Sequence, residues 1–226
     1  MDHNIGELLR TMAGRVHGRR RRALVVLCMI GITTAQLFAQ RGSQGNIEKL
    51  MSQAGIIFAG RVIDVETGIR DRMNLYMTAY TFQVLDPVFG VDTDTLTIKQ
   101  YGGEANGHKF YPSGIPRFEI GEEVVVFLYP LSYIGMTSAV GKEQGKFWIR
   151  SGDSVGTKVV VNKAENKGLF RKLSHPELVA DQQWLDRGAG PLPYKQFMKT
   201  LHNFAQELKG RNHRQHQTSS NRDLPH

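Results

Sequence analysis

The sequence predicts a mainly β protein, an antiparallel sandwich or small barrel, with a short N-terminal helix and an amphipathic C-terminal helix. Three observations lead to this prediction. About seven short segments rich in β-branched and aromatic residues follow one another without helical stretches between them. Glycine and proline separate these segments. After Lys172 the apolar period lengthens from two residues to three and four, which is typical of helices.

The central predicted strand is the apolar run 122–131, in which residues 124–128 form an unbroken block of valine, phenylalanine and leucine. Such a block is too short to span a bilayer and is typical of a strand covered on both faces, although periodicity alone leaves a buried helix open. Pro116, Gly121 and Pro130 bound the run and favour the strand. The other predicted strands are residues 56–67, 77–85 (ended by Asp86-Pro87 and Gly90), 94–101, 135–140, 145–150 and 157–162.

Helical spacing occurs near both ends of this strand series. Residues 46–54 form a short helix with Asn46 as its cap and Gly55 as its end. Ser174 caps a second short helix through residue 185. Residues 194–208 form an amphipathic helix that Gly210 ends. This helix is expected to dock on the barrel, and the alternative is a membrane-surface or partner helix.

The N-terminal segment 1–39 has the pattern of a secretory signal peptide. Four consecutive arginines at 19–22 precede the ten-residue apolar run 23–32, and small residues follow. Cleavage after Ala35 and cleavage after Ala39 both fit, and retention of the segment as an anchor is the alternative. The chain is therefore expected to be secreted or periplasmic. It divides into a signal peptide (1–39), a β-barrel domain (46–173), a helical extension packed on the barrel (174–209) and a disordered basic tail (210–226).

Charge and cysteine content narrow the function classes. The net charge is +8, but residues 1–39 contribute +4 and residues 210–226 contribute +2, which leaves +2 for the body. A basic nucleic-acid-binding surface needs clustered charge on the folded part, so nucleic acid is an unlikely partner. Cys28, the only cysteine, lies in the signal segment. Once that segment is removed, the protein has neither a disulfide nor a thiolate metal ligand.

No catalytic apparatus is expected from the motifs. Ser154 stands in a G-x-S-x-G sequence, but β-forming residues follow it where a nucleophile elbow needs a helix, so a hairpin turn is the simpler interpretation. Glu122 and Glu123 are adjacent on a strand and point to opposite faces, which favours solvated side chains near a strand start over an acid–base pair. No enzyme activity, cofactor or metal is therefore predicted. His213 and His216, with His226 nearby, could bind a metal only loosely, because their segment has no predicted order and no carboxylate stands at ligand spacing, while His108, His175 and His202 are isolated.

The glycine-rich turn after residue 101 is more informative. Its glycines and Asn106 tolerate positive φ, which fits either a structural turn with a bulge or one side of a binding face. In the second interpretation Glu104, Arg117 and Lys146 form a polar rim. A Glu–Arg pair inside the barrel mouth is the structural alternative. The candidate binding residues are Gly102, Gly103, Glu104, Asn106, Arg117, Phe118, Gln144 and Lys146.

Several motifs, taken in order, resemble a family of exported bacterial proteins. They are IIFAGRVIDVE, YTFQVLDPVFG, DTLTIKQYGGEANG, PRFEIGEEVVVFLYP and VGKEQGKFWI, and the match covers about residues 47–208. The resemblance implies a fold similar to the OB-type barrel of the tissue inhibitors of metalloproteinases and of netrin C-terminal modules. Those inhibitors place an N-terminal cysteine on the protease zinc, which a cysteine-free mature chain cannot do. No catalytic residues are established for the family, so none carry over.

These observations lead to one main hypothesis and two alternatives. The main hypothesis is an exported, non-enzymatic binding or interaction module whose partner is another exported protein. The first alternative, an inhibitor or escort of a secreted protease, follows only from the fold resemblance. The second is oligonucleotide or glycan binding on the barrel face, with stacking on the aromatic residues near Arg117, namely Tyr101, Phe110, Tyr111 and Phe118.

Overall fold

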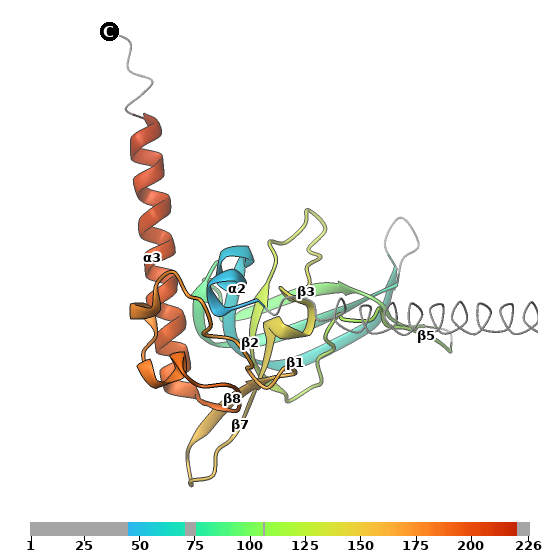
Figure 1. Ribbon diagram of the computed structural model, residues 1–226. Coiled ribbons are helices and arrows are strands. Elements are labelled where there is room, and N and C mark those ends of the chain that lie inside the picture. The colour runs from blue at the N-terminus through green and yellow to red at the C-terminus, as the bar shows by residue number, and fades with distance from the viewer. Residues whose placement is uncertain (1–44, 71–75, 106, 221–226) are drawn as a thin grey trace, which may run out of the picture. The chain divides into compact units, whose positions relative to one another are not determined.

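The computed structural model describes residues 45–70, 76–105 and 107–220, with the side chains at 69, 70 and 212–220 left aside. The predicted signal peptide, Cys28 and Asn106 lie outside the described residues. A seven-stranded antiparallel sheet has the order β3-β2-β1-β6-β7-β8-β9 (Figure 1). Its strands are β1 (Ile56–Arg70), β2 (Tyr76–Phe89), β3 (Thr95–Tyr101), β6 (Glu123–Leu128), β7 (Lys146–Ser151), β8 (Lys158–Asn162) and β9 (Leu192–Pro193). The mainly β prediction is confirmed.

The connections between these strands form a Greek key. β1, β2 and β3 follow one another as a meander, and β6 then returns to pair with the other edge of β1. This spatial order, fourth strand beside the first, defines the motif. The long connection between β3 and β6 contains a separate hairpin of β4 (Gly103–Ala105) and β5 (His108–Phe110). Among the described residues no ladder joins β3 to the β7–β9 side, so the sheet is not closed into a barrel.

β6 lies at the centre of the sheet and separates two cores. Val125 and Phe127 belong to the core on the helix side, while Val124, Val126 and Leu128 belong to the core on the opposite side. All five side chains are fully buried. The prediction of a strand covered on both faces is confirmed, and it explains why this segment has no polar alternation.

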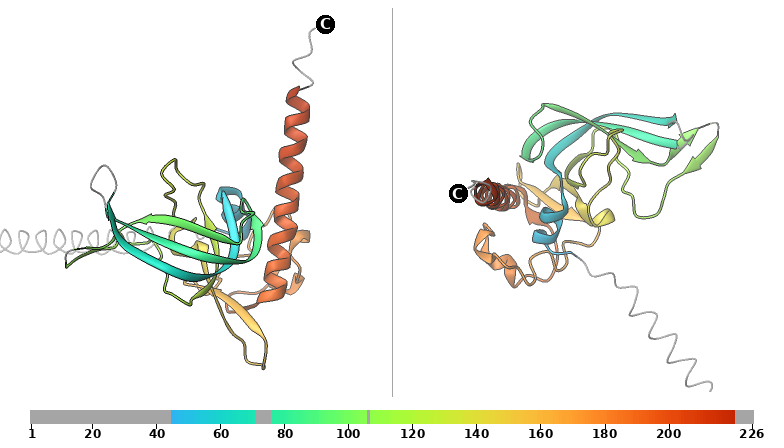
Figure 2. Two further views of the ribbon diagram at one scale, coloured as in Figure 1. Left: turned by 180° about the vertical axis from the view of Figure 1, so that it is seen from behind. Right: turned by 90° about the horizontal axis from the view of Figure 1, so that it is seen from above.

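The helix-side core is covered by α2 (Ile47–Gln53) and α3 (Tyr194–Ser220), which pack against the same face of the sheet (Figure 2). Asn46 caps α2 as predicted, since its side-chain oxygen accepts a hydrogen bond of 2.9 Å from the Lys49 N–H. The apolar stripe of α3 is buried, at Phe197, Met198, Leu201, Phe204 and Ala205. The last turns of α3 extend past the sheet (Figure 1). None of the helices that the structure describes is long and apolar enough to cross a membrane.

The predicted helix ends differ from the observed ones. α3 runs through Gly210 to Ser220, because one interior glycine costs only about 1 kcal/mol and does not break a helix. Part of the predicted disordered tail is therefore helical. Residues 174–185 form two 3-10 turns, η2 (Pro176–Leu178) and η3 (Gln182–Leu185), in place of a helix. His175, not Ser174, stands at the start of η2, and the backbone N–H of Ser174 is bound by Glu48.

Two strand predictions are also corrected. β2 continues through Asp86-Pro87, where only β1 pairs with it, so the missing N–H of Pro87 faces no second strand. The segment 135–140 is not a strand. It makes two isolated bridges, Met136 to Lys99 of β3 and Ala139 to Leu128 of β6, and so links the edge of β3 to the end of β6.

Candidate functional site

The most promising surface is a polar groove beside the N-terminal end of β6 and along β7, here called the Trp148 groove. It consists of two hollows with volumes of about 360 and 690 Å³ that share Glu122, Trp148 and Arg150. The other lining residues are Arg61, Pro116, Arg117, Glu119, Gly121, Glu123, Glu143, Lys146, Ile149, Ser151 and Lys158.

Lys146 lies at the base of the groove and is only 4% exposed. Its Nζ donates hydrogen bonds to Glu122 Oε2 at 2.8 Å and to the Arg117 carbonyl at 2.6 Å. The ammonium group also lies 4.6 Å from the ring centroid of Phe118 and 5.2 Å from that of Trp148. Burial lowers the pKa of Lys146, while the ion pair with Glu122 opposes this shift. Lys146 is thus fully engaged by the protein and fixes the floor of the groove.

Glu122 and Glu123 point to opposite faces of β6, as their adjacency predicts. Glu122 Oε1 accepts the indole N–H of Trp148 at 2.6 Å, in addition to its bond with Lys146. Glu123 binds Arg61 Nη2 at 2.5 Å and Lys158 Nζ at 2.6 Å. These two cations, Arg61 first, lower the pKa of Glu123. The expectation that both carboxylates are merely solvated is wrong, because each one ties neighbouring strands together.

The guanidinium groups of two arginines in the groove lie over aromatic rings. The Arg117 Cζ lies 4.6 Å from the ring centroid of Tyr111, and the Arg150 Cζ lies 5.3 Å from that of Trp148. Each ring is itself held by a carboxylate, since the Tyr111 hydroxyl lies 3.2 Å from Glu104 Oε1 and the Trp148 indole binds Glu122. Neither guanidinium group has a carboxylate partner among the described residues. Their N–H groups are free for a ligand.

The glycine turn has a structural role. Gly102 has φ +104°, and a Cβ there would lie 2.7 Å from Pro112 Cδ. A Cβ at Gly103 would lie 2.7 Å from Thr67 Oγ1, so both glycines permit close backbone packing. Glu104 pairs with Lys109 at 2.8 Å, which lowers the pKa of Glu104. The Glu104–Arg117 pair that was the structural alternative is not formed, and Glu104 does not line the groove.

The remaining candidates are distributed differently from the prediction. Phe118 is 3% exposed and packs edge-to-face on Tyr80 and Phe82, with ring centroids 5.1 Å apart in each pair. It therefore cannot serve as an open stacking platform. Gln144 accepts a hydrogen bond from the Gly45 N–H at 3.1 Å, away from the groove. Of the predicted rim, only Arg117 and Lys146 meet in one place.

Sequence analysis missed Trp148 and Arg150 as site residues. The sequence contains a pattern that could have indicated them. Lys146, Trp148 and Arg150 are alternate residues of β7, so their side chains share one face of the strand. Arg61 and Lys158 come from β1 and β8, and their approach to Glu123 depends on the strand order. No local pattern indicates that approach.

The G-x-S-x-G sequence forms the turn between β7 and β8. The Gly152 N–H donates to the Thr157 carbonyl at 2.9 Å, and the Thr157 N–H donates to the Ser154 carbonyl at 3.1 Å. β8 follows the turn directly, so the hairpin interpretation is confirmed.

Within the described part of the chain, no cluster of three or more His, Cys, Asp or Glu side chains has an arrangement that could hold a metal ion.

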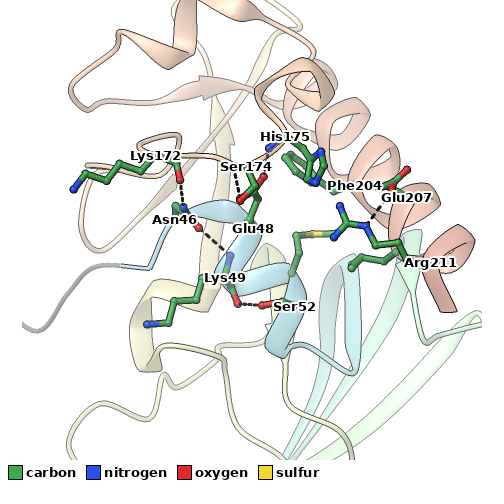
Figure 3. A pocket seen from close by; sticks show the side chains of 12 residues that line it. Asn46, Glu48, Lys49, Ser52, Lys172, Ser174, His175, Phe204, Glu207 and Arg211 are labelled. Carbon is green, nitrogen blue, oxygen red and sulfur yellow. Dashed lines mark hydrogen bonds and ion pairs between the residues drawn. The ribbon is translucent and has the colours of Figure 1, made fainter. Parts of the chain in front are cut away.

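A separate hollow, of about 300 Å³, lies between α2, α3 and the segment before η2 (Figure 3). Glu48 accepts hydrogen bonds from the backbone N–H groups of Ser174 at 2.8 Å and His175 at 2.6 Å. Arg211 Nε binds Glu207 Oε1 at 3.0 Å on the opposite wall. Glu48 and Arg211 of this hollow are thus engaged in contacts within the protein. We therefore assign the hollow a structural role.

No protein-family model, curated protein or solved structure matches the chain. Its function is therefore inferred from the Trp148 groove.

Proposed function

We propose that this protein is an exported, non-enzymatic binding module with an OB-like but incompletely closed sheet, and that it holds another exported protein in the Trp148 groove. The observation that carries the proposal is the groove itself. Its floor is fixed by the buried Lys146–Glu122 pair, while the guanidinium groups of Arg117 and Arg150 are exposed and have no carboxylate partner in the part of the chain that the structure describes. A surface that is ordered in advance loses little conformational entropy on binding.

The strand order supports an OB-like fold. β1, β2, β3 and β6 form a Greek key, and β7 extends it to five strands. OB folds are five-stranded, partly open Greek-key barrels that bind ligands on their face and loops. The resemblance to exported proteins of this fold agrees with that order, and the signal-like segment 1–39 favours an extracytoplasmic partner.

The chemistry of the groove favours binding over turnover. Its buried amine, Lys146, is bonded to Glu122 and to the Arg117 carbonyl, and Glu122 is bonded to Lys146 and Trp148. No serine–histidine or cysteine–histidine pair lines it. Turnover of any hydrolase or protease substrate that disappears in a Ser154→Ala variant would contradict this part of the proposal.

The binding site is tested by blocking the groove with a bulky label. A Cys28→Ser background leaves no thiol, so Ser151→Cys in the groove and Gln206→Cys on the exposed side of α3 can each be coupled to a maleimide polymer. Both labelled proteins are then used to capture partners from the exported fraction. We expect a partner that the Gln206-labelled protein retains and the Ser151-labelled protein loses. Equal capture by both would place the binding surface elsewhere.

The same experiment separates the alternatives. If the captured partner is a protease, the inhibitor or escort hypothesis gains support.

Export is checked by sequencing the N-terminus of the protein recovered outside the cytoplasm, which should begin at Gln36 or Gln40. An intact N-terminus in a cytoplasmic fraction would contradict the export proposal.

A further inference from the structure

We propose that the Trp148 groove recognises a side-chain carboxylate of an acidic polypeptide segment, held between Arg117 and Arg150. This inference rests on the proposed function, since it takes the groove to be the binding site. It adds the chemical class of the ligand and names Arg117 and Arg150 as the two residues that bind it.

The geometry of the two arginines leads to this ligand. A guanidinium group that stacks on a ring keeps its edge N–H groups exposed in a fixed plane, and this edge matches a carboxylate in a bidentate arrangement. The guanidinium carbon of Arg117 lies over the Tyr111 ring, and that of Arg150 lies over the Trp148 ring. Since Glu104 and Glu122 hold the two rings, the arginines are positioned before any ligand arrives.

The charges of the groove favour an anion. The lining contains five cationic side chains and four carboxylates. Lys146 neutralises Glu122, and Lys163, from outside the groove, pairs with Glu143. Glu123 is shared by two cations, Arg61 and Lys158. Among the described lining residues only Glu119 opposes the charges of Arg117 and Arg150, so the groove keeps an excess of positive charge.

The carboxylates of the groove also limit what kind of anion fits. Glu119, which has no ion-pair partner among the described residues, would repel the neighbouring groups of a continuous row of phosphates or sulfates, as in single-stranded nucleic acid or a sulfated glycan. A polypeptide segment can carry one or two carboxylates separated by neutral or donor groups. Such a segment can place a carboxylate on the arginines and a backbone N–H toward Glu119.

The test uses a fluorescein-labelled peptide of alternating Glu and Ser, and a matched peptide with Gln in place of each Glu. Binding to the purified full-length protein is followed by fluorescence anisotropy. We expect the Glu peptide to bind at least about tenfold more tightly than the Gln peptide, as the loss of charge-assisted hydrogen bonds implies. Arg117→Gln and Arg150→Gln should each remove most of this preference. Arg171→Gln, which removes an exposed arginine outside the groove, should leave it unchanged.

Each other result counts against the proposal. Equal affinities of the Glu and Gln peptides, or an Arg117→Gln/Arg150→Gln variant that binds like the parent protein, would overturn it. So would the absence of Glu-peptide binding together with arginine-dependent binding of oligothymidylate or heparin, which would identify a different anion. If the label at Ser151 still abolishes partner capture in these cases, the proposed function stands and only the carboxylate inference fails.

Discussion

The ammonium group of Lys146 lies 2.8 Å from the carboxylate of Glu122, and the side chain of Lys146 is only 5% exposed. Lys146 is the first residue of β7, and Glu122 directly precedes β6, the strand that pairs with β7. Their pair closes one end of the core that contains Phe118, and it also forms the floor of the Trp148 groove. The same contact therefore supports both the fold and the groove proposed to bind a partner.

Lys146→Met should destabilise the fold by about 2–4 kcal/mol, because it leaves Glu122 half-buried with Trp148 as its remaining side-chain partner. Glu122→Gln in the same protein should recover part of this loss, since it removes the unpaired charge. Urea denaturation of both single variants and the double variant measures the coupling between the two residues. Strictly additive losses would show that the pair does not act as a unit.

Gln100→Met should stabilise the protein by about 1–2 kcal/mol. Gln100 is 2% exposed, and neither atom of its side-chain amide has a hydrogen-bond partner among the described residues. Methionine has a similar volume and no polar group to desolvate. The exposed Gln206→Met is the matched control and should change the free energy of unfolding by less than about 0.5 kcal/mol. A loss of stability at position 100 would show that the amide is satisfied by bound water.

Gly90→Ala should cost more than about 3 kcal/mol, through backbone strain and overlap together. Gly90 has φ +66°, and an added Cβ would lie 1.9 Å from the Gly55 carbonyl oxygen. Gly156 has φ +75° but open space around it, so Gly156→Ala carries the strain alone and should cost about 1 kcal/mol. Thermal unfolding compares the two. Equal losses would mean that the backbone at Gly55 moves away without penalty.

Stability should fall in acid partly through Glu123. Arg61 and Lys158 lower its pKa, so its stabilising contribution is complete above the unfolded-state pKa of about 4.3 and is lost as the pH drops through the lower folded-state value. Glu123→Gln should therefore lower the free energy of unfolding by about 1–2 kcal/mol at pH 7. The difference from the parent protein should shrink as the pH falls below about 4.3 and through the lower folded-state pKa.

The control for this pH profile is Glu165→Gln, at an exposed carboxylate without an ion pair in the described part of the chain. It should leave the acid limb of the stability curve unchanged. A Glu123→Gln variant whose deficit does not shrink at all as the solution becomes more acidic would indicate lost packing in place of a lost ion pair.

The elements that sequence analysis predicted well have local causes. The block 124–128 forms β6 because its valines and phenylalanine suit a strand covered on both faces. The stripe of α3 and the Asn46 cap of α2 follow from spacing and from one side chain. In each case the residues that determine the structure lie within a few positions of one another.

The wrong predictions occur where contacts with residues distant in the sequence determine the local structure. Residues 174–185 lose their helix because Glu48 binds the Ser174 and His175 N–H groups and Trp184 is buried against Phe170. The strand predicted at 135–140 is reduced to bridges with β3 and β6. The Trp148 groove brings together Arg61, Arg117 and Lys158 from separate parts of the chain. Its alternating β7 residues could be read from the sequence, but their partners could not.

The Greek key has a consequence for how the chain acquires its structure. Arg61 and Glu123, which join β1 to β6, are 62 residues apart, while β1 and β2 are neighbours in the chain. During synthesis the β1–β2 hairpin can form early, but the second edge of β1 waits for β6. Such long-range pairing slows folding, and an open strand edge invites intermolecular pairing meanwhile. A holdase that covers the β1 edge should raise the yield of native protein, and weakening β6 should shift newly made chains toward aggregates before it affects the finished fold.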